Sequence, residues 1–400
     1  MKAIKFAFRI LFAAGWSILL AGGAAHSIGQ TLEKKEGCIR IATYNVALHR
    51  DALGDLAKEL ASDHSRPAKS ISEVIQRVRP DILLLNEIDF DQQGNTANLL
   101  DEKYLQRPQN GLQPITYPHH FVAPVNTGVD SGMDLNHDGK KQTADDAFGY
   151  GKFPGQFGMV VFSNFEIDRS QVRTFQNFLW KDMPGAALPA QPDSNNPFYN
   201  DEIQNLFRLS SKSHWDVPIL VGHRTIHFLV SHPTPPVFDG PEDKNGCRNH
   251  DEIRLWADYV AGKADYLYDD QKQQGGLPSD SWFVIAGDLN ADPIDGDSRN
   301  HAIQQLLNHD GINSLFTPSS TGGAFWAEKQ GGENKNHQGN PSFDTGDFSD
   351  RVGNLRIDYV LPSKNLKISG SGVFWPKPDE PGSKAAQASD HRLVWIDVEK

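Results

Sequence analysis

Six short polar clusters contain most of the residues in this 400-residue chain that could do chemistry. Each cluster lies at the boundary of a run of apolar, β-forming residues. The clusters are Thr43-Tyr44-Asn45, Asn86-Glu87, Ser231-His232, Gly287-Asp288-Leu289-Asn290, Arg356-Ile357-Asp358-Tyr359 and Ser389-Asp390-His391. Carboxylate and amide oxygens bind hard divalent cations, and imidazoles transfer protons or neutralise charge. If the clusters converge at one end of a sheet sandwich, they form a site suited to metal-assisted attack on phosphorus.

The elements that must position these clusters can be read from apolar periodicity. Strands are expected at 38–45, 81–85, 158–163, 217–221, 225–230 and 282–286, and two more flank the loop at 375–389. Helices are expected at 70–80, 249–268 and 302–307, with a short one at 99–105; most of 91–150 and all of 317–350 are predicted as loop. Strands in both halves with helices between them predict an α+β layered sandwich, with sheets inside and helices outside.

The N-terminal 25 residues have the order of a secretory signal peptide. A basic start (Lys2, Lys5, Arg9) precedes the apolar run 10–20 and the small residues 21–25. A membrane anchor is the alternative, but the run is shorter than the roughly 20 residues that a spanning helix needs. We therefore expect an exported protein, secreted or periplasmic, without a stable membrane anchor.

Charge and cysteine content narrow the function classes. The formal net charge is −12 and becomes −15 when the three basic and no acidic residues of 1–25 are removed. This acidity disfavours a tight DNA binder, which needs a basic surface, but not a nuclease that releases its product quickly. Cys38 and Cys247 are expected at opposite ends of the sheets and therefore unpaired. We expect residues 36–400 to form one domain. We also expect the protein to be a monomer.

An insertion at about 126–150 contains a candidate calcium loop. Asp134, Asn136, Asp138, Lys140 and Asp145 occupy the positions of liganding residues in a twelve-residue loop, with Gly139 at the sharp turn. An acidic turn without an ion is the alternative. We favour a structural calcium ion that orders the insertion.

Four further residues are candidates for the rim of the site. Lys212 and His214 precede a strand expected to be antiparallel to the one ending at His232, and Arg248 and His250 lie in the loop 237–250 that follows His232. They could contact a second phosphate or a leaving group. Ordinary solvated loop charges are the commoner case.

Taken together and in order, the six clusters resemble the endonuclease/exonuclease/phosphatase superfamily over residues 40–398. The resemblance implies a four-layer α/β/β/α sandwich of the deoxyribonuclease-I-like type. It also implies that Glu87 is the main ligand of a catalytic Mg²⁺ (or Mn²⁺), with Asn45 nearby and Asp390 at the metal or the attacking water. Each residue taken singly has a simpler interpretation, as a strand cap, a turn residue or a structural histidine.

The same resemblance implies roles for the remaining residues. Asp288 would orient or deprotonate water, Asn290 would bind a phosphate oxygen, and Asp358 would hold His391 as an imidazolium. His232 would act as acid or electrostatic stabiliser beside the scissile phosphate. Its Pro-rich successor departs from the family pattern, and Gln156 is expected where some relatives have a carboxylate partner for this histidine.

The sequence therefore predicts a secreted, divalent-metal-dependent phosphoester hydrolase, a phosphodiesterase or phosphatase. An extracellular DNA or RNA endonuclease is the alternative, so nucleic acid stays a candidate substrate. A non-catalytic, calcium-stabilised binding protein is the rival from another class, and it would require damaged positions among the six clusters.

Overall fold

The computed structural model describes residues 32–194 and 196–400. The expected signal peptide at 1–25 lies outside these residues. Within the described ranges, no helix is both long enough and apolar enough to span a bilayer.

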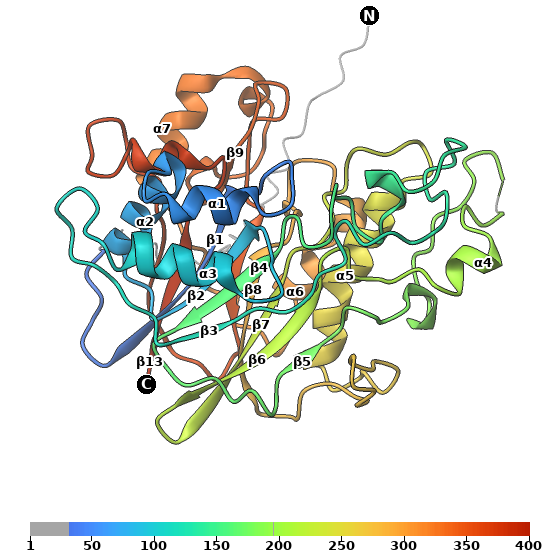
Figure 1. The fold of residues 1–400 in the computed structure, drawn as a ribbon, viewed down its shortest axis with the longest axis horizontal. Coiled ribbons are helices and arrows are strands. Elements are labelled where there is room, and N and C mark those ends of the chain that lie inside the picture. The colour runs from blue at the N-terminus through green and yellow to red at the C-terminus, as the bar shows by residue number, and fades with distance from the viewer. Residues whose placement is uncertain (1–31, 195) are drawn as a thin grey trace, which may run out of the picture.

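Two β-sheets pack face to face in the centre of the molecule, and helices cover the outer face of each (Figure 1). In spatial order, the first sheet contains β12 (Ile368–Val373), β13 (Val394–Glu399), β1 (Cys38–Leu48), β2 (Ile82–Ile88), β4 (Met159–Ser163) and β3 (His119–Phe121). The second contains β11 (Asp358–Pro362), β8 (Trp282–Asp288), β7 (Arg224–Ser231), β6 (His214–Val221) and β5 (Arg173–Thr174). A separate two-stranded pair joins β9 (Gly346–Asp347) to β10 (Asn354–Leu355). The predicted layered sandwich is confirmed.

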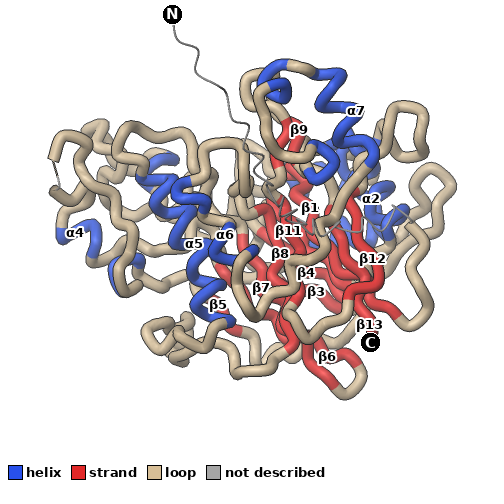
Figure 2. The backbone as a smooth tube through the Cα atoms, turned by 180° about the vertical axis from the view of Figure 1, so that it is seen from behind, coloured by secondary structure: helices blue, strands red, loops and turns tan. Residues whose placement is uncertain are grey.

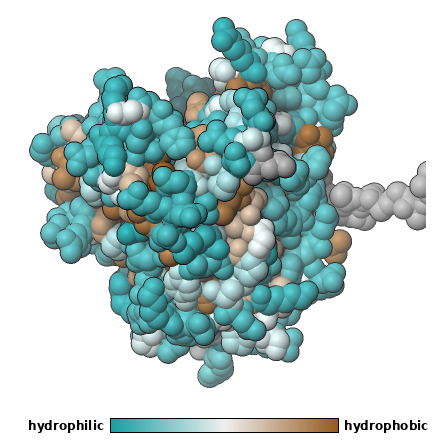
Figure 3. Space-filling model, turned by 90° about the vertical axis from the view of Figure 1, so that its right-hand side faces the viewer, coloured by the Kyte–Doolittle hydropathy of each residue, from teal (hydrophilic) through white to brown (hydrophobic). Residues whose placement is uncertain are grey.

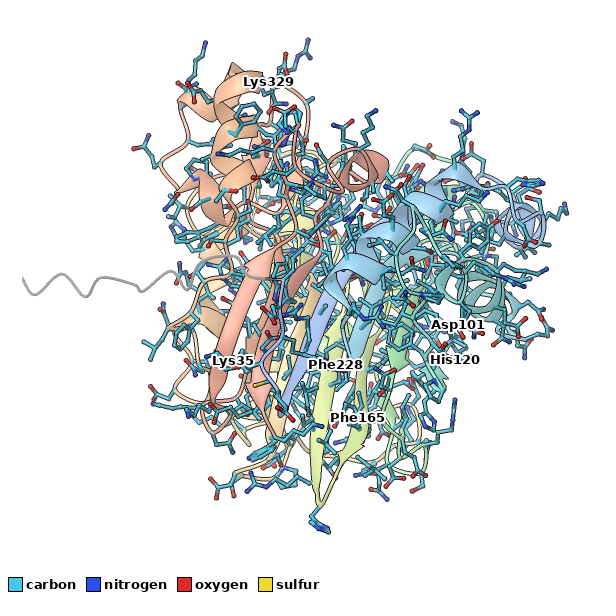
Figure 4. The ribbon with its side chains drawn as sticks, turned by 90° about the vertical axis from the view of Figure 1, so that its left-hand side faces the viewer. Lys35, Asp101, His120, Phe165, Phe228 and Lys329 are labelled. Atoms are coloured by element: carbon cyan, nitrogen blue, oxygen red, sulfur yellow. The ribbon has the colours of Figure 1, made fainter. Side chains whose placement is uncertain are left out.

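Alternation along the strands builds three buried layers, because successive side chains point to opposite faces of a sheet. In β1, Ile39 and Ile41 face the other sheet, whereas Ala42 and Tyr44 face the helices outside. Phe228 of β7 lies in the layer between the two sheets, as the stick view shows (Figure 4). Both sheets thus share one apolar core.

The outer helices divide between the two sheets (Figures 1 and 2). α1 (Asp55–Ala61), α2 (Arg66–Val78) and α3 (Asn95–Leu100) cover the first sheet. α5 (Lys244–Val260) and α6 (Gln304–Leu307) cover the second, while α4 (Asp201–Gln204) lies at the far end of the insertions. The face shown in Figure 3 is mostly hydrophilic, with hydrophobic side chains in separate small patches.

Helix boundaries differ from the expected ones for local reasons. α2 begins at Arg66, earlier than expected, because the Ser65 hydroxyl accepts a hydrogen bond from Ala68 N–H and caps it. α5 begins five residues before the expected start and ends at Val260, just before Gly262 turns the chain with a φ of +66°. The expected helix at 99–105 is α3 followed by a single π-turn over Asp101–Leu105.

The prediction of loop throughout 317–350 is wrong, because α7 (Thr321–Gln330) lies there. Its glycines suggested a loop, but they serve close packing. A Cβ on Gly322 would lie 1.8 Å from the Trp375 carbonyl oxygen, so only glycine lets the helix approach that backbone.

The cysteine prediction is confirmed, since Cys38 and Cys247 are both buried free thiols. A buried ion pair instead joins the first strand, β1, to the last strand, β13. Arg40 of β1 donates through Nε and Nη2 to the two carboxylate oxygens of Asp397 in β13, at 2.7 and 2.8 Å.

We expect Asp397→Ala to destabilise the protein by about 3–5 kcal/mol, because it leaves the buried Arg40 guanidinium without its counter-ion. The double variant Arg40→Met/Asp397→Leu should be less destabilised than Asp397→Ala. Urea unfolding followed by circular dichroism measures both differences. Equal losses for the single and double variants would contradict this account of the pair.

Candidate active site

The strand registers bring the six clusters to one end of the sandwich. β1 and β2 run parallel with Asn45 opposite Asn86, and β7 runs parallel to β8, so their carboxyl ends lie together. β11 is antiparallel to β8 with Asp358 directly opposite Asp288. β13 is antiparallel to β1, which places the residues before β13 at that same end.

A glycine allows the closest approach between two of these strands. Gly287 has a φ of +152°, and a Cβ there would lie 2.0 Å from the carbonyl oxygen of Ser231. Any other residue would push the end of β7 away from β8. Gly287 therefore keeps the Ser231-His232 cluster close to Asp288.

Asp288 is the centre of the converging groups. Its Oδ2 accepts a hydrogen bond from Asn45 Nδ2 at 3.0 Å. The same oxygen lies 3.4 Å from His232 Nε2 and 3.6 Å from His391 Nε2. Burial raises the pKa of Asp288 to about 7, against the opposing charge of His391.

His391 and Asp358 form a buried pair beside Asp288. His391 Nδ1 lies 2.9 Å from Asp358 Oδ2, and the Thr345 hydroxyl donates to the same oxygen at 2.8 Å. Burial lowers the pKa of His391, but Asp358 and Asp288 outweigh it and raise that pKa to about 10. The imidazolium with a fixed ring orientation is the form that this environment favours.

The pair should contribute to stability in a defined pH window. Because the folded pKa of His391 is raised from 6.5 to about 10, its stabilisation is full below pH 6.5 and is lost as the pH rises to about 10. We expect the stability advantage of the wild type over His391→Gln to shrink across that range by up to about 5 kcal/mol. Urea unfolding in chelator at several pH values measures it, and an advantage that stays constant with pH would exclude this charge state.

Glu87 is held by two side chains from the end of β1. Asn45 Nδ2 donates to Oε1 at 3.0 Å, and His49 Nδ1 lies 3.0 Å from Oε2. Burial favours the neutral acid, but the hydrogen bonds with His49 and Asn45 hold the pKa of Glu87 well below its usual range. Glu87 also has a φ of +60°, a conformation that is uncommon outside glycine and clusters at functional sites.

His232 is buried without the expected neighbour. Its Nε2 faces Asp288, whereas Nδ1 has no hydrogen-bond partner among the described residues. Burial and the charge of Lys212 hold the pKa of His232 well below its usual range. Gln156 is not its partner, because the Gln156 amide donates to the Arg50 carbonyl and accepts from Lys152 N–H.

Two predicted site residues occupy less central positions. Asn290 Nδ2 donates to the Pro233 carbonyl at 3.0 Å, which ties the Pro-rich loop after His232 to the end of β8. Asp390 is exposed, and its neighbour His391, not Asp390 itself, enters the acidic group around Asp288.

Three of the four predicted rim residues lie elsewhere. His214 is fully buried, with Nδ1 2.7 Å from Ser210 Oγ and Nε2 2.9 Å from the Glu252 carbonyl oxygen, so its placement at the rim is wrong. Arg248 is also interior, donating to backbone carbonyls that include Leu209. His250 pairs with Asp251 on α5. Lys212 is buried next to the site.

The calcium-loop residues form a compact turn. Asp134 accepts hydrogen bonds from the Asp138 and Gly139 N–H groups, and Asn136 Oδ1 accepts from Asp138 N–H. Lys140 N–H donates to Asp138, and Asp145 is exposed. Calcium binding here stays a prediction.

Two groups of side chains within the described residues could hold a cation. They are Glu87, His232 and Asp288, and Asp288, Asp358 and His391, each with ligand atoms within 4.8 Å of one another. The oxygen donors suit a hard divalent ion such as Mg²⁺. Asp358 Oδ1 is buried without a hydrogen-bond partner among the described residues, so this oxygen is available to bind a cation. The Glu87 side chain is 20% exposed and is therefore the most accessible of the three carboxylates.

Sequence reasoning missed two residues that position this group. His49 lies four residues after Asn45, so its place at the end of β1 could have signalled it. Thr345 holds Asp358 from within the region expected to be loop, and nothing in the sequence marked it.

Several solved structures are similar to this chain at low identity. An endonuclease/exonuclease/phosphatase from Beutenbergia cavernae is 18% identical, with a TM-score of 0.49 over 90% of this chain and 71% of that one. A beta toxin variant of Staphylococcus aureus with bound magnesium ions is 13% identical, with a TM-score of 0.47 over 91% and 100%. TDP2 from Caenorhabditis elegans is 12% identical, with a TM-score of 0.44 over 93% and 77%.

No curated protein matches the sequence. The model of the Endonuclease/Exonuclease/phosphatase family matches residues 42–391, which is most of the chain and includes every one of the six clusters. Members of this family are generally metal-dependent hydrolases that act on phosphoesters. The chain belongs to the Endonuclease/Exonuclease/phosphatase family.

Proposed function

We propose that this protein is a divalent-metal-dependent phosphoester hydrolase. The observation that carries the proposal is the arrangement around Asp288, where a carboxylate, two imidazoles and an amide meet beside Glu87. Each residue to which a catalytic role is assigned here is of a type that can perform that role. This counts against a binding protein that has merely kept the fold.

The chain's own residues would divide the reaction as follows. Asp288 accepts a proton from the attacking water as its oxygen bonds to phosphorus, and the bond from phosphorus to the leaving oxygen breaks. His391, oriented by Asp358, neutralises the charge that develops on the phosphoryl oxygens. His232 faces the same carboxylate from the other side, where its N–H can donate to the departing oxygen.

Glu87, with Asn45 beside it, would hold the cation. When bound, a divalent ion there supplies charge neutralisation at the phosphoryl oxygens and orients water. Mg²⁺ is the proposed ion, with Mn²⁺ as the alternative.

A substrate panel tests the proposal. Hydrolysis of p-nitrophenyl phosphate, bis-p-nitrophenyl phosphate, plasmid DNA and sphingomyelin would be measured with Mg²⁺, Mn²⁺ or Ca²⁺ and with chelator. We expect metal-dependent turnover of a small phosphoester; efficient cleavage of DNA alone would support the endonuclease instead. No turnover of any substrate, with any of these ions, would overturn the proposal.

We also propose that the protein is exported and monomeric, on the basis of the N-terminal pattern, the acidic composition and the mostly hydrophilic face shown in Figure 3. Expression of the full chain in a bacterium, followed by fractionation and N-terminal sequencing, tests cleavage near residue 25. Light scattering during size-exclusion chromatography gives the mass. An uncleaved cytoplasmic product, or a stable dimer, would contradict the respective statement.

The loop around Asp138 is proposed to bind one structural Ca²⁺. We expect 1 mM Ca²⁺ to raise the Tm of the wild type by a few degrees, since an ion that binds only the folded state stabilises it. The increase should vanish in Asp134→Asn/Asp138→Asn while Mg²⁺-dependent turnover persists. Scanning calorimetry measures the shift, and an equal calcium response in both proteins would refute the site.

A further inference from the structure

Lys212 is a buried lysine whose backbone is fixed next to the candidate active site. The residue is 8% exposed and lies just before β6. Its carbonyl accepts a hydrogen bond from Asn126 N–H at 2.8 Å. The preceding Ser211 N–H donates to Glu252 Oε1 at 2.6 Å. These contacts leave the backbone little freedom, so the direction of the side chain is set by the fold.

The ammonium of Lys212 has no hydrogen bond or ion pair among residues 32–194 and 196–400. Glu252 is the nearest strong acidic influence, but its two oxygens are occupied by the N–H groups of Ser211 and Thr234. Buried charged groups are normally paired, because leaving water without a partner is costly. Lys212 Nζ is not among the fully enclosed polar atoms, so the end of this mostly buried side chain still reaches solvent, where the oxygens of a ligand can bind it.

The surroundings of Lys212 identify where such a ligand would bind. After burial and Glu252, the charges that act on its pKa are those of Glu87 and Asp288. Lys212 in turn lowers the pKa of His232, whose Nε2 is 3.4 Å from Asp288 Oδ2. The Ser211 hydroxyl donates to the His232 carbonyl at 3.4 Å, and His214 lies opposite Ser231 in the paired strands β6 and β7. The residues on both sides of Lys212 therefore lie against the Ser231-His232 cluster, which places Lys212 on the His232 side of the candidate active site.

We propose that Lys212 binds the non-bridging oxygens of the substrate phosphoryl group and makes the site prefer phosphate monoesters to diesters. The proposal rests on the proposed function and names its substrate class. A monoester phosphate carries a charge between −1.5 and −2 at neutral pH, whereas a diester carries about −1. The site already contains the carboxylates of Asp288, Asp358 and Glu87, which repel the more negative substrate. A desolvated ammonium offsets that repulsion most strongly for the monoester.

Three variants separate charge from structure. Lys212→Met removes the charge and keeps an unbranched chain, and Lys212→Arg keeps the charge. Lys329→Met is the matched control, because Lys329 is exposed on α7, on the part of that helix that points away from the sheets (Figure 4). The full-length mature protein would be used, with folding of each variant checked by thermal unfolding.

The main measurement is kcat/KM with Mg²⁺ for p-nitrophenyl phosphate and bis-p-nitrophenyl phosphate. We expect the wild type to prefer the monoester. Lys212→Met should lower the monoester value by about 10²-fold, as loss of one donor to a charged oxygen does elsewhere, and the diester value at least ~10-fold less. Lys212→Arg should recover part of the loss, and Lys329→Met should match the wild type. Equal losses on both substrates, or no loss, would overturn the proposal.

Calorimetric titration with inorganic phosphate provides a readout that does not depend on turnover. We expect binding to weaken about 10-fold in Lys212→Met and to persist in Lys212→Arg. Unchanged phosphate affinity in Lys212→Met would refute the role of the lysine even in an active enzyme. Conversely, an inactive wild type that still binds phosphate through Lys212 would refute the proposed hydrolase function and leave the binding site standing.

Discussion

Glu87→Gln is expected to lower the metal-dependent kcat/KM by on the order of 10³-fold while the protein stays folded. The substitution keeps the size of the side chain but removes the negative charge that would hold the cation. Metal assistance contributes several kcal/mol of transition-state stabilisation, and each 1.36 kcal/mol corresponds to tenfold in rate. Steady-state kinetics over a range of Mg²⁺ concentrations measures the effect, which should include a weaker dependence on Mg²⁺.

Glu102→Gln is the matched control for this change, because Glu102 is an exposed glutamate on the first sheet's side of the molecule. It should retain wild-type kinetics. Near-normal turnover and Mg²⁺ dependence in Glu87→Gln would show that the cation is held elsewhere. A loss of folding in Glu87→Gln would point instead to the hydrogen bonds with Asn45 and His49 as its main role.

Asp288→Asn should abolish most activity without destabilising the fold. Removal of a general base typically costs about 10²–10⁴-fold in rate. Asn keeps the shape of Asp but cannot accept the proton of water. Turnover under saturating substrate and metal measures the loss, and Asp297→Asn, at an exposed aspartate nearby, serves as the control.

The same variant makes a prediction about stability that has a definite sign. Because burial raises the pKa of Asp288 from 3.8 to about 7, the unfolded chain ionises first, and stability falls as the pH rises between these values. Asp288→Asn abolishes this loss and should therefore gain up to about 4 kcal/mol over the wild type above pH 7 in chelator. Urea unfolding at pH 5 and pH 8 tests it. A variant less stable than the wild type at pH 8 would mean that the attraction of His391 to Asp288 outweighs the burial cost.

Local sequence patterns predicted most of the architecture because strands with one buried face alternate visibly. Ile39, Ile41 and Ala42 show that alternation in β1. The pattern predicts that this strand ends at the polar Asn45, but β1 continues to Leu48. Prediction from local sequence failed where tertiary packing requires a residue type that usually indicates a loop. The glycine-rich start of α7 reads as loop, yet Gly322 is needed for close contact with the Trp375 backbone.

The sequence by itself determined which residue types stand at the strand boundaries, and therefore that the chemistry involves carboxylates, amides and two histidines. Only the tertiary structure decided how they are paired. Asp288 meets Asn45, His232 and His391 through strands far apart in the chain, and such contacts depend on sheet order and register rather than on local pattern. The same reason separates Lys212 from His214. Lys212 precedes β6 and His214 is its first residue, but the fold places Lys212 beside the acidic group and His214 against α5.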